Sequence, residues 1–154
     1  MPAPSFSEHQ SGVGLIEVLV ALLILSIGLL GISLVQVRAL NGNNSSMGRS
    51  MAVVASYSIL EAMRADRANA LAGAYNQTVI ANASCTVGTT TTLAAAQLAN
   101  WCAELRGTLG AATTTTGTVA CSGTGDCTVT ISFDDSRIGA GGSSTMQVLT
   151  RAVL

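Results

Sequence analysis

The chain has 154 residues, a formal net charge of -1 and only 10 % charged residues, so it lacks the basic surface that nucleic acid would require. It contains no lysine, and its single histidine, His9, precedes the first long apolar segment. Phosphate-binding GK[ST] loops, Schiff-base chemistry and histidine-assisted nucleophiles are thereby disfavoured. We therefore predict that the protein is not an enzyme and has no cofactor, no metal site and no catalytic residue.

The first long feature is an apolar segment near the N-terminus. Residues 1–12 are polar, contain both prolines and are predicted to be a leader peptide. Residues 18–37 then carry no charge over twenty positions, which is the length that an α-helix needs to cross a bilayer. We assign residues 13–40 to this transmembrane helix. Glu17 lies at its front edge, where a carboxylate in contact with lipid is costly.

Residues 12–21, GVGLIEVLVA, resemble the N-terminal motif of type IV prepilins and of the pseudopilins of type II secretion. The resemblance implies that a prepilin peptidase cleaves between Gly12 and Val13 and that the new N-terminus of Val13 is methylated. Glu17 then becomes the fifth residue of the mature chain and sets the register of one subunit against the next. The alternative is that Glu17 merely marks the interface of a plain signal anchor.

The resemblance also implies the fold class: α+β, a pilin-like lollipop in which a long N-terminal helix, half of it membrane-spanning, packs against a small antiparallel β-sheet with a short extra helix. Residues 41–154 would be a periplasmic globular domain that includes the second half of this helix. A count of positive residues alone favours the opposite orientation, because arginines follow the span at Arg38 and Arg49.

Helical periodicity returns over residues 47–71, and Gly73 is the expected stop. The turn-like patch 41–46 (NGNNSS) is the weakest point of what we predict to be one continuous helix. Residues 74–92 are predicted to be irregular. Residues 93–109 are predicted to form a further helix, with Trp101 in the core.

The C-terminal third changes to the two-residue period of strands. We predict strands at 113–120, 127–133 and 145–154, with Val129, Ile131 and Phe133 on one face. Residues 134–137 are predicted to form a turn in which Arg137 pairs with Asp134 or Asp135 as an exposed ion pair.

All four cysteines follow the span, and their spacing matches no zinc motif. An even number beyond a membrane segment favours disulfides in an oxidising compartment. Four cysteines allow three pairings, and we prefer the two pairs of sequence neighbours. The disulfide candidates are Cys85, Cys102, Cys121 and Cys127.

Residues 59–68, Trp101 and residues 127–137 resemble the PilV group of minor type IV pilins. The resemblance implies a subunit of the inner membrane that primes or caps pilus assembly and then resides in the pilus at the cell surface. The implied partners are prepilin peptidase, other minor pilins, the major pilin, the inner-membrane assembly platform and membrane lipid. The alternatives are a minor pseudopilin of a type II secretion system and, far less favoured, an anchored envelope enzyme.

Overall fold

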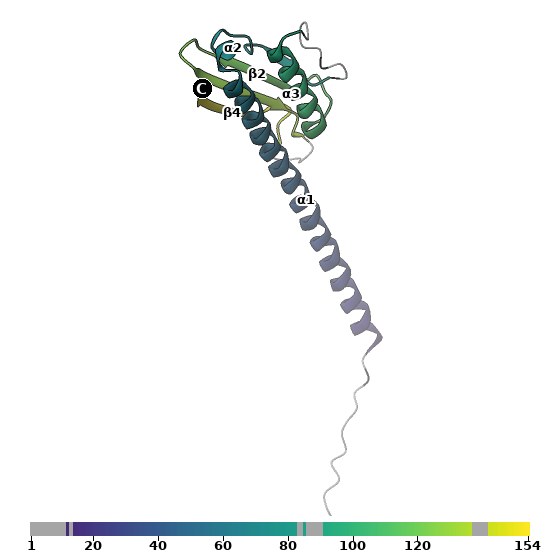
Figure 1. The fold of residues 1–154 in the computed structure, drawn as a ribbon. Helices are drawn as coiled ribbons and strands as arrows, with labels where there is room; N and C mark the ends of the chain where they lie inside the picture. Colours follow the sequence, from purple (N-terminus) through teal and green to yellow (C-terminus); the bar gives the residue numbers. More distant parts are fainter. Residues whose placement is uncertain (1–11, 13, 83–84, 86–90, 137–141) are drawn as a thin grey trace, which may run out of the picture. The chain divides into compact units, whose positions relative to one another are not determined.

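The computed structural model describes residues 12, 14–82, 85, 91–136 and 142–154 (Figure 1). Helix α1, Leu15–Ala65, is a single helix of 51 residues that continues through residues 41–46. The prediction of one continuous long helix is therefore confirmed, and the turn-like patch does not reverse the chain. The chain divides into two compact units, Met1–Ala39 and Leu40–Leu154.

The helix ends earlier than its sequence period indicated. A continuous helix to Leu71 was predicted, and this is wrong at Asp66, where φ is -118° and ψ is 45°. The Asp66 carboxylate instead accepts hydrogen bonds from Asn69 Nδ2 at 2.7 Å and from Tyr75 OH at 3.1 Å. The short helix α2, Arg67–Leu71, follows, and Gly73 ends it with a φ of +83°, as expected.

Four antiparallel strands form one sheet in the order β1-β2-β3-β4. Strands β2, Thr116–Cys121, β3, Asp126–Phe133, and β4, Met146–Val153, confirm the three predicted strands with small changes of boundary. Strand β1, Thr78–Ile80, was missed, because the region 74–92 was predicted to be irregular. Three residues are too few for a two-residue period to be recognised.

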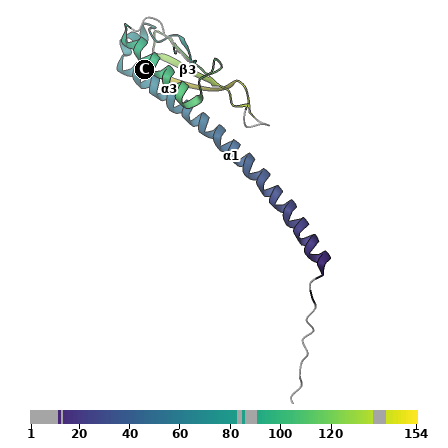
Figure 2. The same cartoon turned by 90° about the vertical axis from the view of Figure 1, so that its right-hand side faces the viewer.

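Helix α3, Leu93–Leu109, lies beside the second half of α1 in both views (Figures 1 and 2). The core of the second unit lies between the sheet and these two helices. The predicted inward face of β3 is confirmed, since Val129, Ile131 and Phe133 are all buried. These findings confirm the α+β class: a long N-terminal helix, a small antiparallel sheet and the further helix α3.

Trp101 joins three elements. Its side chain is buried, as predicted, and its Nε1 donates a 2.9 Å hydrogen bond to the carbonyl of Ala55 in α1. Gly117 of β2 lies under the ring, where an added Cβ would stand 2.4 Å from Trp101 Cη2 and 2.7 Å from Leu105 Cδ1. The absence of a side chain at Gly117 is what lets α3 approach the sheet so closely.

Candidate assembly site

The first turn of α1 contains the acid that the sequence singled out. Gly12 is exposed and Val13 lies outside the described residues, so the predicted cleavage site is described on one side only. The carbonyl of Gly14 accepts hydrogen bonds from the N–H of Glu17 at 3.0 Å and of Val18 at 3.4 Å. Glu17 is exposed and stands where the helix dipole favours a negative charge.

The apolar half of α1 has no covering within the chain. Its first two turns are exposed, and so is each of its large side chains from Leu15 to Leu40. Length and composition allow this part of α1 to cross a membrane. An apolar surface of this extent is stable only against lipid or against the helices of other subunits.

Polar groups inside the apolar segment are satisfied locally. Ser26 donates to the carbonyl of Leu23 at 2.8 Å, and Ser33 donates to the carbonyl of Leu29 at 2.9 Å. These bonds remove the need for water at either hydroxyl, as a helix in lipid requires. Gly28 and Gly31 have open space around them, so a neighbouring helix can approach closely there.

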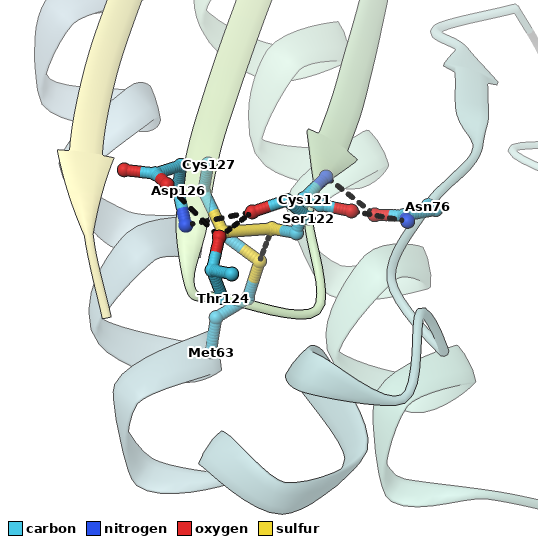
Figure 3. The surroundings of a disulfide bond; sticks show 7 residues. All are labelled: Met63, Asn76, Cys121, Ser122, Thr124, Asp126 and Cys127. Carbon is cyan, nitrogen blue, oxygen red and sulfur yellow. Dashed lines mark hydrogen bonds between the residues drawn. A yellow bond between two sulfur atoms is a disulfide. The ribbon is translucent and has the colours of Figure 1, made fainter.

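One disulfide closes the β2–β3 hairpin. Cys121 and Cys127 are directly paired across the two strands and are joined by an S–S bond (Figure 3). The side-chain amide of Asn76 makes two hydrogen bonds with the backbone of Cys121. Its Nδ2 donates to the Cys121 carbonyl at 2.9 Å, and its Oδ1 accepts from the Cys121 N–H at 2.7 Å. Met63 of α1 lies 3.8 Å from Cys121 Sγ, so the hairpin end is packed against the helix.

The second disulfide joins Cys85, in the segment after β1, to Cys102 of α3. Cys102 is fully buried beside the core. The bond ties Cys85 to α3, the helix that packs on the sheet. The pairing in the structure is thus that of the two pairs of sequence neighbours.

The predicted ion pair of Arg137 with Asp134 or Asp135 stays a prediction. Arg137 lies outside the described residues. Asp135, expected on the surface, is only 7 % exposed and accepts a hydrogen bond from Ser45 Oγ of α1. The Ser45 hydroxyl thus gives the buried Asp135 carboxylate a hydrogen-bond donor, as buried polar groups require. No cluster of three metal-ligating side chains occurs in the part of the chain that the structure describes.

A polar group in the core is also satisfied. Tyr75 is fully buried, and its hydroxyl donates to Asp66 Oδ2 and contacts Gln97 Oε1. Burial raises the pKa of Tyr75 well above its usual value, and the hydrogen bond and negative charge of Asp66 raise it further. No local sequence pattern indicates this contact, because Asp66, Tyr75 and Gln97 belong to different segments of the chain.

The N-terminal part of the chain matches a known family model. Residues 8–33 match the model of the prokaryotic N-terminal methylation motif. No curated protein and no solved structure matches the chain significantly. The motif, which overlaps the exposed apolar half of α1, supports a type IV pilin-like protein that is anchored in a membrane. More particularly, the motif implies processing by a prepilin peptidase and assembly with other pilins, which is the behaviour of a structural subunit.

Proposed function

We propose that the protein is a minor type IV pilin of the PilV kind, a subunit that primes or caps pilus assembly. The observation that carries the proposal is the overlap of the methylation motif, residues 8–33, with the charge-free run of residues 18–37 in α1. Before cleavage, this helix anchors the subunit in the inner membrane. After cleavage, the same apolar surface packs against other subunits in the filament.

Glu17 has a specific role in this proposal. Cleavage between Gly12 and Val13 would create a cationic amine about one helical turn from the carboxylate. Two opposite charges inside an apolar filament core offset part of the cost of burying either one. If the pairing runs from the amine of one subunit to Glu17 of its neighbour, it fixes the axial register of the two helices.

The globular unit would lie in the periplasm before assembly. Two disulfides within it and the lack of any unpaired cysteine among the described residues agree with an oxidising compartment. This unit would supply recognition of sister subunits rather than catalysis, since the chain has no lysine and its one histidine lies in the leader.

Deletion of the gene tests the proposal, with surface pili scored by shearing and electron microscopy. We expect few or no pili, restored by the intact gene. Chemical cross-linking in membranes should join the protein to other pilin-like subunits. Normal piliation of the deletion strain would contradict the proposal. Loss of type II secretion with intact pili would favour the second candidate, a minor pseudopilin, which shares the N-terminal motif.

A further inference from the structure

Strand β4 is an edge strand of eight residues, and every second residue has backbone groups that the sheet does not use. It is the last strand of the sheet, and its register with β3 is unbroken from Asp126 opposite Val153 to Phe133 opposite Met146. The N–H of Leu154 bonds to the carbonyl of Gly125, which fixes the alternation of the ladder. The backbone groups of Gln147, Leu149, Arg151 and Val153 therefore point away from β3.

This edge lacks most of the devices that usually block pairing. Strand β4 contains no proline and no bulge, and Arg151 is its only charged residue. On the solvent-facing side of the sheet, its side chains include exposed Leu149 and Val153. Its inward-facing residues are only half-buried, whereas those of β3 are buried, because no strand lies beyond them.

The opposite edge of the sheet differs. Strand β1 has three residues, and the carbonyl of Ile80 accepts a hydrogen bond from the N–H of Asn82. Little free backbone remains there for a further strand. Of the two edges, only β4 offers a long template for pairing.

A second copy of the chain fits this edge poorly. Gly48 lies against Phe133 and Met63 lies against Cys121, so α1 runs antiparallel to β3 and parallel to β4. An antiparallel pair of β4 strands would be two-fold and would turn the second halves of the two α1 helices in opposite directions. A closed two-fold contact does not extend a filament, in which subunits repeat head to tail. A parallel, two-fold pair would place Arg151 opposite Arg151, and like charges directly opposite destabilise a sheet.

We propose that β4 binds an extended segment of a different pilin subunit, which adds a fifth strand to the sheet and places an acidic residue opposite Arg151. The main-chain bonds would come from the outward N–H and C=O groups, and apolar side chains of the partner would cover Leu149 and Val153. Arg151 is exposed and forms no ion pair with a described residue, so an acid on the partner would be its complement. The inference rests on the proposed function, because the partner is a sister subunit.

The test uses the full-length protein in cells that assemble type IV pili, with a photoreactive residue at Gln147. Mass spectrometry of the cross-linked product should identify an extended segment of another pilin-like subunit that contains Asp or Glu. Leu149→Pro removes one outward N–H and should lower the cross-link yield about tenfold. The matched variant Leu149→Ile keeps the N–H, an apolar side chain and strand propensity, so its yield should stay within about twofold of the parent.

A charge exchange provides the second arm. Arg151→Glu should weaken the cross-link, and an acid-to-arginine change in the identified segment should restore it. Retention of both disulfides in each variant, mapped without reductant, shows that the sheet has folded. Cross-links to a second copy, to a helix, or to nothing would overturn the inference, as would a yield that Leu149→Pro leaves unchanged. If the deletion strain has normal pili, the proposed function fails; if it lacks pili but the Leu149→Pro strain keeps both pili and cross-link, only this inference fails.

Discussion

Ser45 Oγ donates a 2.5 Å hydrogen bond to Asp135 Oδ2, across 90 positions of sequence. Both side chains are buried, at 5 % and 7 % exposure. The contact ties the polar segment 41–46 of α1 to the residues that follow β3. A stretch with the composition of a turn is thus held as helix by a tertiary bond that its own sequence does not reveal.

Ser45→Ala should destabilise this junction. The substitution leaves the buried Asp135 carboxylate without its donor, and we expect a loss of about 1 to 3 kcal/mol in the free energy of unfolding. Hydrogen exchange should become faster over residues 41–48. The control is Ser46→Ala, because Ser46 is exposed and its hydroxyl donates to the carbonyl of Gly42 in its own helix. Equal exchange in the two variants would contradict the role given to Ser45.

Gly117→Ala should separate α3 from the sheet. A Cβ there would stand 2.4 Å from the Trp101 ring, and overpacking of a well-filled core costs about 1 to 3 kcal/mol. The near-ultraviolet circular dichroism of Trp101, the only tryptophan, reports on the core directly. Gly123→Ala is the control, since no atom lies within 4 Å of its added Cβ. An unchanged melting temperature in Gly117→Ala would refute the packing described above.

The two disulfides should differ in their contributions to stability. Their sequence separations are 17 for Cys85–Cys102 and 6 for Cys121–Cys127. Loop-closure entropy predicts a loss of about 3 kcal/mol for the first and about 2 kcal/mol for the second when both cysteines of a pair become serine. Thermal unfolding of the full-length protein in detergent measures both losses. Non-reducing peptide mapping that joined Cys85 to Cys121 would contradict the pairing itself.

Tyr75 should make stability fall at alkaline pH. Its pKa is raised in the folded protein by burial and by Asp66, so the folded state holds the phenol proton more tightly than the unfolded state does. The associated stability is fully present below about pH 10, the unfolded pKa of tyrosine, and is lost as the pH rises above it. Tyr75→Phe should flatten this loss in urea titrations between pH 9 and 11, values chosen to bracket about 10. The same slope in both proteins would show that another group is responsible.

The sequence was sufficient where a long pattern repeats. The charge-free run of residues 18–37 predicted the apolar half of α1 correctly. Strict alternation of polar and apolar residues predicted β3 with Val129 and Ile131 on the buried face. The order of the last three strands followed from turns between alternating segments.

The errors lie where tertiary contacts decide the local structure. Asp66 interrupts a helical period because Tyr75 and Asn69 bond to its carboxylate. Strand β1 is defined by pairing with β2 rather than by any pattern of its own. The buried position of Asp135 depends on Ser45, from a helix far away in the chain. At the candidate assembly site, sequence alone singles out Glu17 because the motif around it is local, and its role in assembly stays a prediction.

The role of Glu17 is the central claim, and one measurement tests it most directly: the fraction of full-length Glu17→Ala protein found in sheared pili relative to membranes. We predict normal membrane insertion, because the apolar helix is intact, and a strong loss from the pilus fraction. Glu61→Ala is the matched control, since Glu61 is an exposed acid on the same helix whose partner is Arg64, and it should enter pili normally. Incorporation of Glu17→Ala at the level of the parent protein would contradict the account.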